Sequence, residues 1–214
     1  MSIATLFGVI RNRWKSEIMA NEDLSSPTLT SATVSAATSD DSFNDATENL
    51  SVFDGYTFIN VSGFTEIANN GIYTVKAVTE DKITVVENLA DEAVGDTVTI
   101  VAALPTIWPN DTTTEVPNNV KHAMVEIEID SRENIEFGET HRDRIEGNLL
   151  ARLRVPAAEG TSVSEALADT VVAAFQHTTT SSVKWLTPRV MPIGTVGAFY
   201  DTNVICPFWY DETS

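Results

Sequence analysis

The segment RIEGNLLARLRVPAAEGTSVSEALADTVVAAF, residues 144–175, decides the fold class, because a strand pattern gives way to a helix pattern within it. Residues 145–155 alternate between apolar and other side chains, which is typical of a strand with one buried face. A break follows at 156–160, and Ser162 and Glu165 have the spacing of a capping box. The helix beyond is expected to bury Val163, Ala166, Leu167, Val171, Ala174 and Phe175.

The sequence on either side of this segment supplies the rest of the domain. Residues 122–130 alternate as a second long strand, and the polar residues 131–144 are expected to form a protruding tip between the two strands. Residues 183–190 and 198–210 predict two closing strands, and residues 1–20 carry the apolar stripe of an amphipathic helix. The fold class is therefore α+β, a mostly antiparallel sheet with two helices on one face.

The middle of the chain predicts a separate domain, inserted after the first helix. Residues 21–49 are rich in Ser, Thr, Ala and Asp and suggest loop or a short irregular hairpin. From residue 51, short apolar runs alternate with turn signals such as Asn69–Gly71, which predicts a small all-β barrel or sandwich. We therefore assign residues 1–20 and 105–214 to the α+β domain and residues 21–104 to the insertion.

The charge balance limits the possible partners. The 214 residues carry a formal net charge of −18, and residues 21–104 hold 14 acidic and only two basic residues. This balance excludes a general nucleic-acid binder, which needs a basic face, and disfavours an anionic membrane surface. No apolar run approaches the roughly 18–20 residues that span a bilayer, and the first helix lacks the features of a signal peptide. Because Cys206 is the one cysteine, no intrachain disulfide forms.

Catalytic motifs are weak throughout the sequence. His141-Arg142-Asp143 resembles a kinase catalytic-loop tripeptide, but the asparagine five residues after the aspartate is missing. His122, His141 and His177 are too far apart for zinc spacing, and Cys206 lies within an alternating strand as a small core residue. The sequence therefore predicts a protein that is not an enzyme and needs no cofactor.

One row of acids leaves two alternatives open. Glu126, Glu128 and Asp130 fall on one face of a predicted strand, where three carboxylates could hold a hard cation. Alternating acids on the open face of a sheet are more often simply solvated, and the prediction is that no metal binds here.

The chain resembles the tail terminator, or tail-completion, proteins of long-tailed phages. The resemblance rests on the order of LPTIWPND at 104–111, the strand-to-helix segment at 144–175 and VMPIGTVGAFYDTNVICPFWY at 190–210. The sequence VSGFTEIANNGIYTVKAVTEDKITVVENLADEAVGDTVTI, residues 61–100, is similar to small β-domains inserted in phage tail and neck proteins. Two phage-like segments in one chain support each other.

The resemblance implies a structural role in the virion. A homohexameric ring would cap the finished tail tube, end its polymerisation and form the interface to the head-side connector. The implied partners are the tail tube protein and a head-completion or connector protein. DNA would pass through the ring without specific binding. The implied location is the tail–head junction of the virion, assembled in the host cytoplasm.

Two sets of residues are candidates for this role. The polar hairpin could pair its charges with a neighbouring subunit or with the tube, although an ordinary solvated loop is the alternative. The acids at 126–130 could face the lumen and repel phosphate. The hairpin residues are Arg132, Glu133, Glu136, Glu139, Arg142 and Arg144, and the lumen-facing acids are Glu126, Glu128 and Asp130.

Other functions stay open from the sequence. A head–tail joining neck protein belongs to the same class, and a carboxylate-based hydrolase lacks a close acid pair with a supporting histidine. A module that binds a glycan or host surface would need an aromatic platform on the inserted domain, although the spacing of its aromatic residues fits core strands better. These residues are Phe53, Tyr56, Phe58, Phe64 and Tyr73.

Overall fold

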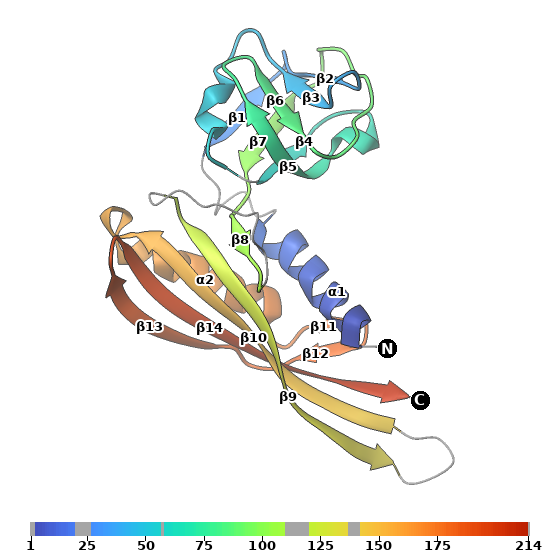
Figure 1. Cartoon of the computed structure of the whole chain (residues 1–214), viewed down its shortest axis with the longest axis vertical. Coiled ribbons are helices and arrows are strands. Elements are labelled where there is room, and N and C mark those ends of the chain that lie inside the picture. The colour runs from blue at the N-terminus through green and yellow to red at the C-terminus, as the bar shows by residue number, and fades with distance from the viewer. Residues whose placement is uncertain (1–2, 20–26, 57, 110–119, 137–141, 214) are drawn as a thin grey trace. The chain divides into compact units, whose positions relative to one another are not determined.

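A computed structural model describes residues 3–19, 27–56, 58–109, 120–136 and 142–213. The chain divides into two compact units, each of which is described by itself (Figure 1). Unit 1 comprises Met1–Ile18, Thr106–Thr113 and Asn118–Ser214, and unit 2 comprises Met19–Pro105 and Thr114–Pro117. The α+β fold class is confirmed, because strands predominate and mostly antiparallel sheets combine with two α-helices.

Unit 1 is built on three long antiparallel strands. The strand order is β11-β12-β14-β10-β9-β8, with β13 also paired to β14, and only the short β8–β9 pair is parallel. The bounds are β8 Thr106–Ile107, β9 His122–Glu136, β10 Arg142–Pro156, β11 Thr179–Thr180, β12 Val183–Trp185, β13 Arg189–Val196 and β14 Phe199–Thr213.

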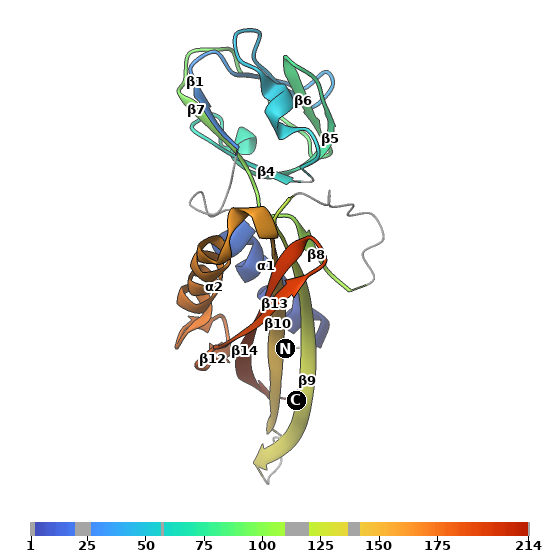
Figure 2. The same ribbon diagram turned by 90° about the vertical axis from the view of Figure 1, so that its left-hand side faces the viewer.

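Two helices cover the same face of this sheet (Figure 2). They are α1, Ile3–Trp14, which continues in a π-helical turn at Lys15–Met19, and α2, Thr161–Phe175. Aromatic rings connect the layers, because Phe175 of α2 lies 6.2 Å from Trp14 and 4.6 Å from Trp185, measured between ring centroids. These rings are almost completely buried, so they anchor both helices to the sheet.

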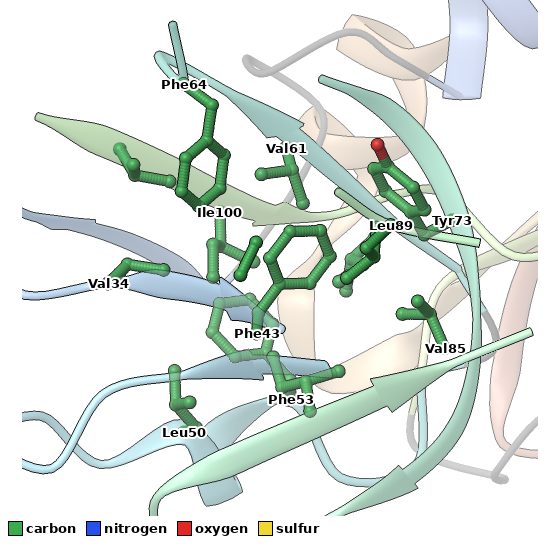
Figure 3. Close-up of a cluster of buried hydrophobic side chains, with 14 of the residues drawn as sticks. Val34, Phe43, Leu50, Phe53, Val61, Phe64, Tyr73, Val85, Leu89 and Ile100 are labelled. Atoms are coloured by element: carbon green, nitrogen blue, oxygen red, sulfur yellow. The ribbon is translucent and has the colours of Figure 1, made fainter. Parts of the chain in front are cut away.

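Unit 2 is a small all-β domain with its own core. Its strands follow the order β1-β7-β4-β5-β6-β3-β2. Phe43 lies at the centre of the core, stacked 5.7 Å from Phe64 and edge-on at 5.1 Å to Tyr73 (Figure 3). The bounds are β1 Thr28–Ser31, β2 Ser35–Ala37, β3 Ser42–Asn44, β4 Phe58–Ser62, β5 Gly71–Val78, β6 Lys82–Val85 and β7 Val98–Ala102, with 3₁₀ turns at Leu50–Phe53 and Ile67–Asn69.

The hairpin prediction was wrong about where the strands end. β9 runs to Glu136 and β10 begins at Arg142, so most of the expected polar tip is strand. The ladder continues with register shifts, including one between Glu146 and Gly147. Oppositely charged side chains across β9, β10 and β14 pair with one another along this part, and such pairs support strand structure where no apolar pattern predicts it.

Two local predictions were also wrong. The expected strand at 183–190 ends at Trp185, and a new strand, β13, begins at Arg189 after Pro188. No side-chain hydrogen bond caps α2, whose N-cap residue is Gly160, so the predicted capping box does not form. The segment expected to be loop or irregular hairpin contributes three strands, of which β2 and β3 do form a hairpin. Among the described residues, no helix is long and apolar enough to span a membrane.

Candidate functional site

The long sheet of unit 1 has a helix-covered face and an open face. Ser164 of α2 bonds Thr202 of β14 at 2.8 Å, so the even-numbered residues of β14 face the helices. Leu150 and Ile205 are opposite each other in the register and project to the other side. We define the open face by the even residues 122–128 of β9 and 146–154 of β10, and the odd residues 199–209 of β14.

An apolar groove lies on the open face. Its volume is about 540 Å³, and its apolar lining comes from β8 and the residues after it, from the long strands and from β13. Oδ1 of Asn203 also lines the groove side of β14, and among the described residues it is buried without a hydrogen-bond partner. The main apolar lining residues are Ile107, Trp108, Met124, Leu150, Met191 and Ile205.

A buried carboxylate sits beside the groove. Asp201 has a fully buried side chain and accepts hydrogen bonds from Nε of Arg152 at 2.9 Å and Nε of Arg154 at 3.1 Å. The Arg154 guanidinium also lies 4.6 Å from the ring centre of Phe199, which packs edge-on against His122. Because each oxygen of the Asp201 carboxylate accepts a hydrogen bond from an arginine, this cluster fixes the open face and is not a free acid.

The sequence predictions missed both the groove and Asp201. The signal for the groove was present, because Leu150 and Ile205 are apolar residues on the face that should have been polar. The spacing of Arg152 and Arg154 puts two guanidiniums on one face, but only the register shows that Asp201 lies opposite them. Cross-strand register is a tertiary property that a single strand's pattern does not contain.

The predicted lumen acids do lie on one exposed row of β9. Glu126, Glu128 and Asp130 are all exposed, and Glu126 also lines the groove. Asp130 accepts a hydrogen bond from Nδ2 of Asn148, whereas Glu126 and Glu128 make no ion pair with a described residue. Among the described residues, no three His, Cys, Asp or Glu side chains group in a way that could hold a metal ion.

The predicted contact arginines are engaged within the subunit. Arg132 lies 2.7 Å from Asp143 and 3.0 Å from Glu212. Arg144 donates to Asp211 at 2.9 Å, and this hydrogen bond holds the pKa of the Asp211 carboxyl below its usual value.

The end of the long strands also carries an aromatic ring between two cations. The Arg144 guanidinium lies 4.0 Å and the Lys184 ammonium 4.5 Å from the ring centre of Trp209. Arg142, the third predicted arginine, pairs with Asp211 at 2.9 Å. These charges are therefore already compensated within the subunit, which weakens the prediction that they pair with a neighbouring subunit or with the tube.

The acidic hairpin residues are described only in part. Glu133 is exposed and makes no ion pair with a described residue. Glu139 and the side chain of Glu136 lie outside the described part of the chain, as does His141.

Two further reactive groups, Cys206 and His122, are buried. Cys206 is fully buried, and burial raises the pKa of its thiol to about 12, so it stays protonated at neutral pH. Burial also lowers the pKa of His122 below its usual value, although a hydrogen bond to the Val120 carbonyl opposes this shift. Neither group has the exposed, polarised surroundings of a nucleophile or general base.

The aromatic residues of unit 2 form core and not a platform. Phe53, Phe64 and Tyr73 are buried, and Tyr56 and Phe58 are partly buried. Oη of Tyr73 donates to the Ala68 carbonyl at 2.6 Å. A glycan-binding platform requires exposed ring faces, which Phe53, Phe64 and Tyr73 do not offer.

Comparisons with known proteins return no match, either among family models or among curated proteins.

Proposed function

We propose that this protein is a structural virion protein that caps a phage tail tube as a ring, ends tube polymerisation and forms the interface to the head-side connector. One observation carries the proposal. Among the described residues, no helix covers the open face of unit 1's long sheet, and an apolar groove lies in it, whereas helices pack on the other face. An extended surface of this kind is typical of a subunit that assembles with others.

The resemblance in the order of sequence segments supports the same role. The proline-punctuated segment at 104–111, the strand-to-helix segment at 144–175 and the closing segment at 190–210 all fall in unit 1 or at its boundary.

The acids on the open face give the ring a second property. Glu128 and Asp130 are exposed, and we propose that their row lines the lumen, where the acidic charge in excess of any cation from a neighbouring subunit repels the phosphates of the passing DNA. A ring whose channel is basic would contradict this part of the proposal.

Addition of the purified protein to polymerising tail tubes tests the function. A terminator stops growth, so electron micrographs should show shorter tubes with one capped end as the protein concentration rises. Tubes that reach the same length with and without the protein would exclude tube termination. If it instead binds completed heads or tails without affecting growth, the head–tail joining neck function replaces the proposal.

A further inference from the structure

The sheet of unit 1 has two long edge strands, β9 on one side and β13 on the other. Within the described part of the chain, β8 pairs with β9 only at Ala123 and Met124, and β13 pairs only with β14. Beyond Met124, therefore, β9 presents backbone N–H and C=O groups that no described strand pairs, and β13 does so on its outer side. Such edges invite pairing with another chain unless charges, prolines or bulges block them.

β13 is poorly protected as an outer edge. It contains Pro192 and a register shift between Pro192 and Gly194, which limit but do not prevent pairing. Four of its eight residues are apolar side chains that are between 38% and 50% exposed, namely Val190, Met191, Ile193 and Val196. Apolar side chains that are this exposed on an edge strand favour aggregation of a monomer and are typical of an interface.

The two edges carry complementary charges. Arg189 begins β13, is exposed and makes no ion pair with a described residue. Glu126 and Glu128 are exposed on β9 and likewise have no described cationic partner. Each edge therefore lacks the charge that the other one offers, which suits a head-to-tail contact between copies.

The strand directions and faces also agree with such a contact. β9, β10, β14 and β13 alternate in direction, so β13 of one subunit can follow β9 of the next in an antiparallel arrangement. Arg189 lies opposite Ile205 and Met191 opposite Asn203, which places both on the open face with Glu126 and Glu128. Rotation about one axis keeps the open face on the same side in every subunit.

We propose that β13 of each subunit pairs with the outer edge of β9 in the next copy of this chain, with Arg189 beside Glu126 and Glu128. The inference rests on the proposed ring, and it assigns the two surfaces that close it. Met191 extends the apolar groove at the joint, and Ile193 and Val196 become covered. The charges of the Asp201 cluster and of Arg132, Arg142 and Arg144 are not needed for this contact.

A charge-exchange experiment tests the contact by native mass spectrometry. Arg189→Glu and the double variant Glu126→Arg/Glu128→Arg each place like charges at the joint. Each alone should therefore assemble with a dissociation constant at least about tenfold higher than that of the natural protein. In an equimolar mixture, each variant carries the charges that the other requires at both of its edges, so mixed rings should form again. Lys76→Glu, at an exposed residue of unit 2, is the charge-matched control and should assemble normally.

The apolar half of the contact has its own variant. Ile193→Ser removes an apolar side chain that is 50% exposed, and it should weaken assembly without changing the melting temperature of the subunit. Ile67→Ser, at a residue of unit 2 that is 84% exposed, is its matched control.

The outcomes separate this inference from the proposed function. Rings of Arg189→Glu as stable as those of the natural protein would overturn the inference and leave the function standing. Dissociated variants whose mixture stays dissociated would also overturn it, because β13 would then meet some surface other than β9. A natural protein that stays monomeric at every concentration would overturn the proposed ring itself.

Discussion

Unit 2 and unit 1 hold their buried carboxylates with different donors. In unit 2, Asp45 is 1% exposed, and its oxygens accept hydrogen bonds from the hydroxyls of Ser31, Thr33 and Thr47. These donors are short, local and neutral. A domain with 14 acidic and two basic residues therefore satisfies a buried acid without a cation.

In unit 1, long cationic side chains bind the corresponding carboxylates. Asp201 is held by Arg152 and Arg154, and Asp211 by Arg142 and Arg144. The guanidiniums keep part of their surface in solvent, on the face that also holds the groove. Asp45 of unit 2 is thus held by hydroxyls inside its own fold, whereas unit 1 keeps its arginines on the same surface as the apolar groove.

The placement of tryptophan allows the two units to be followed separately. Trp14, Trp108, Trp185 and Trp209 all belong to unit 1, and unit 2 contains none. Tryptophan fluorescence therefore reports the unfolding of unit 1, and hydrogen exchange measured on peptides of 27–104 reports unit 2.

The largest expected effect comes from Phe43→Ala in unit 2. Phe43 is fully buried against Phe64 and Tyr73, so the cavity and lost contacts should cost about 4 kcal/mol. Hydrogen exchange should become faster across unit 2, while the tryptophan transition in urea stays in place. A tryptophan midpoint that falls by the same amount would show that the two units unfold together.

The next effect is expected from Asp201→Ala in unit 1. Removal of a fully buried carboxylate leaves Arg152 and Arg154 without their partner and should cost about 3 kcal/mol, measured as a lower urea midpoint of tryptophan fluorescence. Asp201→Asn, which keeps the shape but not the charge, should lose less. Equal losses for both variants would mean that the charge alone, and not the shape of the side chain, is what Asp201 contributes.

Acid should destabilise both units, whereas salt should distinguish them. Burial opposes ionisation of Asp45, but the Ser31 and Thr47 hydrogen bonds outweigh it and hold its pKa below the usual value, as Arg144 does for Asp211. A depressed folded-state pKa adds stability above the unfolded value of about 4, and that stability is lost as the pH falls through the folded pKa.

At neutral pH, added salt screens the arginine pairs of unit 1 and leaves the hydroxyl contacts of unit 2 unaffected. The urea midpoint measured by tryptophan fluorescence should therefore be lower at high salt than at low salt, whereas hydrogen exchange in unit 2 should stay the same. Asp45→Asn should remove part of the loss of stability that unit 2 shows in acid. Destabilisation by salt that is confined to unit 2 would contradict this expected difference between the two units.

The smallest effect is expected for Lys82→Ala. The Lys82–Asp40 pair, at 2.7 Å, is an exposed ion pair of unit 2, with side chains 38% and 42% exposed. Solvent screens such a pair, so hydrogen exchange in unit 2 should not change measurably. A clear loss of protection would mean that unit 2 depends on cations after all.

Elements with a strong periodic pattern of apolar residues were predicted from the sequence, and elements that depend on pairing with distant strands were missed. The stripe containing Leu167, Val171 and Phe175 predicted α2, and these residues are buried as expected. β13 was missed because its exposed residues and two nearby prolines give no buried period, and its pairing with β14 is what makes it a strand.

The candidate site was predictable only in part. The exposed row of Glu126, Glu128 and Asp130 follows directly from alternation along one strand. The compensation of Arg132 and Arg144 by residues of neighbouring strands depends on register, which no local pattern specifies. The groove needs β8, β9, β10, β13 and β14 together, so it emerges only from the assembled sheet.

The proposed function depends most on whether unit 1 forms a ring. Native mass spectrometry and negative-stain imaging of the purified protein, alone and with isolated tails, test this directly. A closed oligomer, with six copies expected, should be seated on one end of the tail tube. A strictly monomeric protein that never associates with tails would contradict it.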